Sequence, residues 1–234
     1  MNPQTVDGWD LNVTNKNFTA TIQNQVARSG NAIKMVAKGH SYIWAQDFSV
    51  KPGTIYILSY WVRVDSAKGL KFAPYMNDAN YNGHWWLDDA AQPVYEKTKG
   101  WVKIASAVSV PESLGQNKNN PEHKVQLGFQ IYEGAGTIYL DDVSFVPTKV
   151  KATDKNLDFE LDKTVLYNWS FASYNGGNGS ATTSTQTRPG SKGKVSAVVT
   201  NKGASGNSIF TGSKIKVKPN TTYQFTYWPK QTGD

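Results

Sequence analysis

The sequence predicts an all-β protein built as an antiparallel β-sandwich. Its 234 residues are dominated by short runs in which apolar and polar residues alternate, a pattern typical of strands with one buried face. Gly, Pro and Asn separate these runs, and few segments have the period of an amphipathic helix. Frequent strands joined by short turns favour two packed sheet layers.

Five runs carry the strand signal: 41–50, 54–64, 101–110, 125–132 and 136–146. The clearest is 125–132, where apolar residues alternate with the set Gln126, Gly128, Gln130 and Tyr132. Successive strand side chains point to opposite faces, so we expect the apolar set in the core and the polar set outside. Gly134–Thr137 predicts a turn between the last two runs.

An internal repeat divides the chain. "VKPGTIYILSYWV" at Val50–Val62 recurs as "VKPNTTYQFTYWP" at Val217–Pro229, at a constant offset of 167 residues. We expect a first module over 1–147, a linker over 148–155 and the N-terminal part of a second module over 156–234. Neither copy holds every motif of the other, which indicates a piece of a longer protein. Core packing is the favoured role for the repeated Trp61 and Trp228.

Composition excludes several classes of protein. There is no cysteine, which excludes disulfides and thiolate chemistry, and no run approaches the ~18 apolar residues of a membrane span. Residues 1–148 hold 13 Lys and Arg against 13 Asp and Glu, so the net charge of +7 lies in the remainder. A nucleic-acid binder concentrates basic residues on its binding domain, so we expect neither a nucleic acid nor a membrane as partner.

Several motifs together resemble a known family. "NLDFE" followed by Trp, then "VKPGTIYILSYWVRV", "GW" and "IYLDDVSF", are similar to carbohydrate-binding modules of families 4, 16 and 22, above all family 16. The resemblance implies a jelly-roll sandwich, often in tandem beside the catalytic domain of a secreted bacterial glycanase. It implies binding of β-glucan, mannan or xylan chains on a concave sheet face. It also implies a structural calcium near Asp141, with Glu160 supplied here by the second unit.

Sugar recognition needs flat aromatic rings for stacking and amides for directional hydrogen bonds. Gln126, Gln130 and Tyr132 form a suitable polar row on one strand face, although an ordinary solvated face is an equal alternative. By resemblance, Trp9 and its repeat partner Trp169 are candidate stacking platforms, with core or loop anchoring as the alternative. Tyr75 is a further candidate for the cleft.

Two adjacent tryptophans, Trp85 and Trp86, raise a separate question. In a strand they point to opposite faces, so a core needs only one of them. They lie in an irregular stretch, 77–93, which predicts a long loop or a short edge hairpin. An exposed aromatic residue there favours ligand contact, whereas a pair that merely covers the end of the sandwich is the alternative.

The leading hypothesis is therefore a non-catalytic polysaccharide-binding module of a secreted or cell-surface enzyme. It requires no cofactor, and the structural calcium is implied only by the resemblance. No motif for catalysis stands out, and the adjacent pairs Asp88/Asp89 and Asp141/Asp142 are expected to diverge rather than flank a glycosidic bond. Two alternatives remain open. One is a structural or adhesive cell-surface sandwich, and the other is a binder of acidic polysaccharides such as alginate.

Overall fold

The computed structural model describes residues 5–6, 8–11, 17–45, 47–78, 84–86, 96–151, 159, 169–174, 179–201, 207–212, 217–224 and 226–231. Their regular structure is β, apart from one 3-10 turn, η1 (Glu112–Gln116). The prediction of an all-β chain is confirmed. None of the described segments forms a helix long and apolar enough to cross a membrane.

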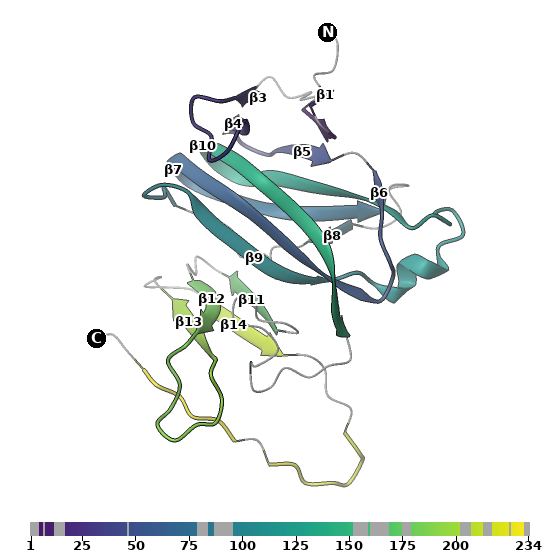
Figure 1. The fold of residues 1–234 in the computed structure, drawn as a ribbon, viewed down its shortest axis with the longest axis vertical. Coiled ribbons are helices and arrows are strands. Elements are labelled where there is room, and N and C mark those ends of the chain that lie inside the picture. Colours follow the sequence, from purple (N-terminus) through teal and green to yellow (C-terminus); the bar gives the residue numbers. More distant parts are fainter. Residues whose placement is uncertain are drawn as a thin grey trace.

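Ten strands form one antiparallel sheet around two long central strands, β7 (Thr54–Asp78) and β10 (Lys124–Lys151) (Figure 1). One edge of β10 pairs with β7 along most of its length. Its other edge pairs in turn with β4 (Ala32–Lys38), β5 (Ser41–Ala45) and β6 (Phe48–Ser49). The free edge of β7 pairs with β9 (Val102–Ser109) and β8 (His84–Trp86). The sheet is completed by β1 (Thr5–Val6), β2 (Trp9–Asp10) and β3 (Phe18–Gln23).

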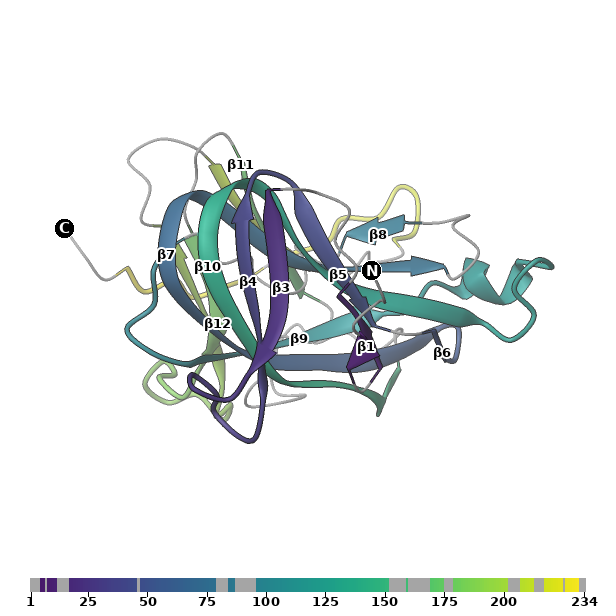
Figure 2. The same cartoon turned by 90° about the horizontal axis from the view of Figure 1, so that it is seen from above.

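The sheet folds over along a glycine crease. Gly39 N donates to Gly134 O at 2.7 Å, and a Cβ built on Gly134 would lie 2.1 Å from Gly69 O. Gly134 also has a φ of +77°, so only glycine fits this approach without strain. The predicted turn at Gly134–Thr137 is wrong: β10 bends here through two register shifts and continues as one strand (Figure 2).

The crease divides the sheet into two halves that enclose the core. The β9 half comprises β3, β4, β9, residues 54–66 of β7 and residues 137–151 of β10. The β5 half comprises β2, β5, β6, β8, residues 70–78 of β7 and residues 124–131 of β10. The ring of Tyr60 in the β9 half meets Phe129 in the β5 half at 4.9 Å. This cross-layer contact confirms the sandwich.

Strand parity decides which residues enter the core. The predicted apolar face of run 125–132 is confirmed, because its four members are buried: Val125, Leu127, Phe129 and Ile131. In β7 the buried set is Tyr56, Leu58, Tyr60, Val62 and Val64. Trp61 falls between two of these, on the outer face, beneath the guanidinium of Arg28 at 4.1 Å. The core role expected for Trp61 is therefore wrong.

The C-terminal part forms two antiparallel ribbons. One pairs β11 (Trp169–Tyr174) with β14 (Asn207–Gly212), and the other pairs β12 (Gly179–Ser184) with β13 (Ser196–Asn201). The described residues of the repeated motif, 217–224 and 226–229, form no strand. Trp228 is 64% exposed there, so its expected core role is wrong as well. The division of the chain into modules stays a prediction.

Candidate functional site

The outer face of the β5 half gathers aromatic and amide residues from four strands. Trp44 of β5 is opposite Gly128 of β10, which is opposite Tyr75 of β7, which is opposite position 86 of β8. Directly opposed residues share a face of the sheet. The neighbouring rows are Tyr42–Gln130–Ala73 and Gln126–Asn77 with position 84. This set is named the β5 face below.

An aromatic row crosses the β5 face. The ring centroids of Tyr42 and Trp44 are 5.3 Å apart, and those of Trp44 and Tyr75 are 4.3 Å apart in an edge-to-face arrangement. Tyr42 is exposed, Trp44 is half-buried and Tyr75 is buried. A Cβ on Gly128 would lie 2.4 Å from the Tyr75 ring, so the glycine is what allows that ring to lie across β10. Solvent exposure therefore decreases along the row from Tyr42 through Trp44 to Tyr75.

Two glutamines on β10 carry buried amide atoms with spare hydrogen-bonding capacity. Gln130 is only 2% exposed; its Oε1 lies 3.4 Å from His40 Nε2, and its Nε2 has no hydrogen-bond partner among the described residues. Gln126 Nε2 donates to Asp47 Oδ1 at 2.7 Å, whereas its buried Oε1 has no partner in that same part of the chain. The donor and the acceptor of a buried amide are normally both hydrogen-bonded. Gln130 Nε2 and Gln126 Oε1 are therefore the candidate atoms for hydrogen bonds to a ligand.

The remaining predicted residues lie in different surroundings. Tyr132 is half-buried near the crease, with Lys71 Nζ 5.9 Å from its ring centroid. Trp9 is half-buried and packs against Phe129 at 5.8 Å. Trp169 belongs to the β11–β14 ribbon, where it stacks on Phe210 at 4.6 Å. The structure thus brings Tyr75, Gln126 and Gln130 together on one face, and it does not bring Trp169 there.

The register of β8 against β7 shows which of the two adjacent tryptophan positions shares a face with Tyr75. β8 pairs with the end of β7 as a short edge strand, as one of the two readings of 77–93 expected, with Trp85 opposite Met76 and Trp86 opposite Tyr75. Met76 is fully buried in the core, whereas Tyr75 is on the β5 face. Position 86 is therefore the member of the pair on the β5 face. Asp88 and Asp89 lie outside the described residues.

Sequence reasoning missed Tyr42 and Trp44. The signal was present in "SYIWA", where Tyr42 and Trp44 alternate with the core residue Ile43. That run was interpreted only as a strand, since nothing in its letters shows that it lies beside run 125–132. The pairing of Gln130 with Tyr42 and of Gly128 with Trp44 supplies this information.

Asp141 and Asp142 do not diverge as expected. Asp141 Oδ2 accepts from the backbone N–H groups of Arg28 (2.7 Å) and Ser29 (3.2 Å), and its Oδ1 accepts from Asp142 N at 2.7 Å. Asp142 pairs with the Arg28 guanidinium and accepts from Ser29 Oγ at 2.8 Å. A register shift after Asp141, with a φ of +47° at Asp142, turns both carboxylates toward the same loop.

The surroundings of Asp141 do not favour the calcium ion that the resemblance implied. Three N–H donors already occupy its carboxylate, and N–H dipoles suit an anion rather than an adjacent cation. Among the described residues no group of three or more His, Cys, Asp or Glu could hold a metal. Glu160 lies outside them, so the calcium stays a prediction.

The Ser29 hydroxyl, and then the Arg28 guanidinium, lower the pKa of Asp142 below its ordinary value.

Comparisons with known proteins give structural likenesses alone. No protein-family model matches the chain, and no curated protein matches it. Among solved structures, the CBM22-1 xylan-binding domain of Paenibacillus barcinonensis Xyn10C is 12% identical with a TM-score of 0.45, covering 62% of this chain and 89% of that domain. The CBM22-1–CBM22-2 tandem domain of the same protein is 11% identical with a TM-score of 0.46, covering 76% and 52%.

A third structure, TmCBM61 in complex with β-1,4-galactotriose, is 16% identical with a TM-score of 0.37, covering 61% of this chain and 90% of that one. These identities and TM-scores are too low to carry a conclusion about what this chain binds. The fold rests on the strands described above, and family 16 stays a prediction.

Proposed function

We propose that the chain binds a polysaccharide on the β5 face without cleaving it. The observation that carries the proposal is Gln130: a side chain directed away from the core, nearly fully buried, with its Nε2 lacking a partner among the described residues. Leaving a buried donor unsatisfied costs about 1–3 kcal/mol. A sugar hydroxyl that accepts from Nε2 offsets this cost, and Gln126 Oε1 suits a hydroxyl donor in the same way.

The aromatic row supplies the second half of sugar recognition. Tyr42 and Trp44 present exposed and half-exposed ring surface beside the glutamines, and such rings gain from contact with the apolar face of a pyranose. We propose Trp86 as a further ring of this site, because its register position adjoins Tyr75. The proposed ligand classes are β-glucan, glucomannan, mannan and xylan. The proposed context is a secreted protein in which binding raises the local concentration of a linked glycanase on its polymer.

The test is affinity electrophoresis and calorimetry with soluble xylan, β-glucan and glucomannan. Gln130→Ala and Trp44→Ala are each expected to weaken binding at least about tenfold, from loss of a buried hydrogen bond or a stacking surface. Gln116→Ala and Trp61→Ala are matched controls, an exposed glutamine and a tryptophan on the opposite outer face. Absence of retardation by all three glycans, with cooperative unfolding intact, would contradict the proposal.

The tryptophan pair gives a second arm of the same test. Trp86→Ala is expected to reduce glycan affinity with little loss of stability, and Trp85→Ala the reverse. Equal effects of the two substitutions on affinity would remove Trp86 from the site.

A structural or adhesive role is the second candidate, and Trp9 is the observation that favours it. Its ring packs against core residue Phe129 instead of standing free as a platform. Under this alternative, acrylamide leaves most tryptophan fluorescence unquenched and no glycan binds.

A further inference from the structure

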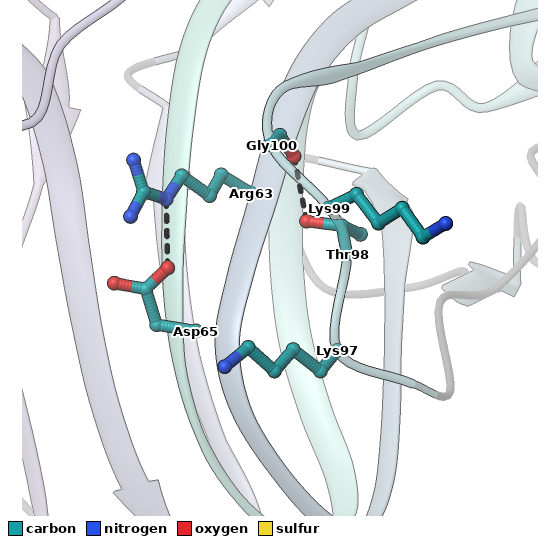
Figure 3. Close-up of a pocket in the computed structure, with 6 residues that line it drawn as sticks. All are labelled: Arg63, Asp65, Lys97, Thr98, Lys99 and Gly100. Atoms are coloured by element: carbon teal, nitrogen blue, oxygen red, sulfur yellow. Dashed lines mark hydrogen bonds and ion pairs between the residues drawn. The ribbon is translucent and has the colours of Figure 1, made fainter.

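A pocket of about 460 Å³ opens on the outer face of the β9 half. It is lined by Arg63 and Asp65 of β7 and by the segment Lys97–Gly100 that precedes β9 (Figure 3). Arg63 and Asp65 alternate with the buried Val62 and Val64, so they point away from the core. The volume falls within the range of small-molecule sites, and the pocket is separate from the β5 face.

Hydrogen bonds hold the wall of this pocket in place. Thr98 N donates to Val64 O at 3.0 Å, and Val64 N donates to Thr98 Oγ1 at 3.0 Å. The Thr98 hydroxyl in turn donates to Gly100 O at 2.6 Å. The segment is therefore fixed against β7 before any ligand arrives, which reduces the ordering cost of binding.

The pocket carries a local excess of positive charge. Arg63, Lys97 and Lys99 line it against the single carboxylate of Asp65, although residues 1–148 are neutral as a whole. Arg63 Nε donates to Asp65 Oδ1 at 2.7 Å, and its terminal Nη groups have no hydrogen-bond partner among the described residues. Figure 3 shows Lys97 extended toward Asp65, whereas Lys99 points the other way.

Lys34 and Arg63 both approach the ring of Tyr139. Lys34 Nζ lies 5.8 Å and Arg63 Cζ 5.9 Å from the centroid of the Tyr139 ring, which is placed between their two strands. Lys34 therefore adds positive charge to the sheet face that carries Arg63, and Asp65 is the only acidic residue among the described residues that line the pocket. An anion gains Coulomb energy here, and Asp65 retains an oxygen that can accept from a hydroxyl.

We propose that this pocket binds an acidic sugar, with the carboxylate between Arg63 and Lys97 and a ring hydroxyl donating to Asp65. A guanidinium presents paired N–H donors that match a carboxylate. The combination of two cations with one acceptor distinguishes a sugar acid from a bare anion, which has no hydroxyl to donate, and from a neutral sugar. The site is on a different face from the proposed polysaccharide site and does not depend on it.

The test is amide NMR titration of the whole chain with glucuronate, neutral glucose and sodium sulfate in parallel. Glucuronate is expected to shift the amides of Val64, Lys97, Thr98 and Gly100, less at high salt because the groups are partly exposed. Arg63→Gln and Lys97→Gln are each expected to weaken it about fivefold, near the upper end for exposed ion pairs. Lys118→Gln, a distant exposed lysine, and Gln130→Ala are expected to leave it unchanged.

Four results would overturn the proposal, and the first three concern glucuronate, glucose and the control lysine. They are the absence of shifts with glucuronate, equal shifts with glucose, and weakening by Lys118→Gln as large as that by Lys97→Gln. Sulfate binding as tightly as glucuronate also overturns it, because the pocket then holds any small anion and not a sugar acid. Because Gln130→Ala affects only the β5 face, failure of this proposal and failure of the proposed function give different results.

Discussion

The segments Val50–Val62 and Val217–Pro229 have closely similar sequences and different surroundings. In both, a backbone N–H donates to a tyrosine hydroxyl five residues later: Lys51 to Tyr56 at 2.9 Å, and Lys218 to Tyr223 at 2.8 Å. In both, the third residue after the valine has a positive φ, with Gly53 at +70° and Asn220 at +55°. Glycine and asparagine are the residues that tolerate this conformation.

An arginine also stacks on the repeated tryptophan in both copies. Arg28 Cζ lies 4.1 Å from the ring centroid of Trp61, and Arg188 Cζ lies 4.3 Å from that of Trp228. The first copy is a strand, because β9 and β10 pair with its two edges, whereas residues 217–224 and 226–229 of the second copy form none. The turn and the tyrosine hydrogen bond are therefore local, because they join residues within a few positions, whereas the cation–π contact and the strand require distant segments of the chain.

Hydrogen exchange is the measurement expected to separate the two copies most. Amides of Tyr56–Val62 lie inside the sheet and should exchange only with global unfolding, whereas those of Tyr223 and Trp228 should exchange much faster. A protection ratio on the order of a thousand or more follows from the span between local and global opening. Similar protection at matched positions would show that the second segment is paired in solution.

Paired tyrosine substitutions should give the next largest effect. Tyr60 is 0% exposed and packs on Phe129, whereas Tyr227 is 67% exposed. Tyr60→Ala is expected to lower the free energy of unfolding by about 3–5 kcal/mol, and Tyr227→Ala by less than about 0.5 kcal/mol. Urea denaturation of both variants measures the difference, and equal losses would contradict the comparison.

Removal of the tyrosine hydroxyls isolates the local contact. Tyr56→Phe should lower the free energy of unfolding by about 1 kcal/mol, the net value of a typical hydrogen bond. Tyr223→Phe should leave global stability unchanged while its Lys218 amide moves toward the chemical shift of an unstructured lysine. A Lys218 amide that stays unmoved would show that the shared turn does not need the tyrosine.

The smallest expected effect concerns Asp142, which pairs with Arg28, the arginine that stacks on Trp61. Its pKa is lowered in the folded state, so its contribution to stability is present above the unfolded pKa and is lost as pH falls through the folded value. A carboxyl NMR titration should show this low pKa, and Ser29→Ala should raise it toward the ordinary value. Ser49→Ala, an exposed serine on β6, is the control and should leave the titration unchanged.

Much of the fold could be predicted from alternation, because parity within one strand is a local property. Run 125–132 has its apolar residues in the core and its glutamines outside, as expected. The continuous path of β10 through Gly134–Thr137 could not be predicted. The same letters suit a turn, and the approach of Gly69 from β7 is a contact between residues far apart in the chain.

The candidate site was predicted only in part for the same reason. Gln126, Gln130 and Tyr75 were identified from their own strands, but Tyr42 and Trp44 join them only through the pairing of β5 with β10. Likewise, parity predicted that Trp85 and Trp86 lie on opposite faces of a strand, without telling which of them shares a face with Tyr75. The register against Met76 and Tyr75 makes that assignment.

The sequence by itself determined the strand periods, the turn at each KPG or KPN and the tyrosine bond beside it, because these depend on residues within a few positions of one another. The tertiary structure alone decided which copy of the motif becomes a strand, where the sheet folds over, and which rings share a face with Gln130. Each of these depends on hydrogen bonds and packing between segments far apart in the chain. The sequence of one strand does not show which other strand pairs with it.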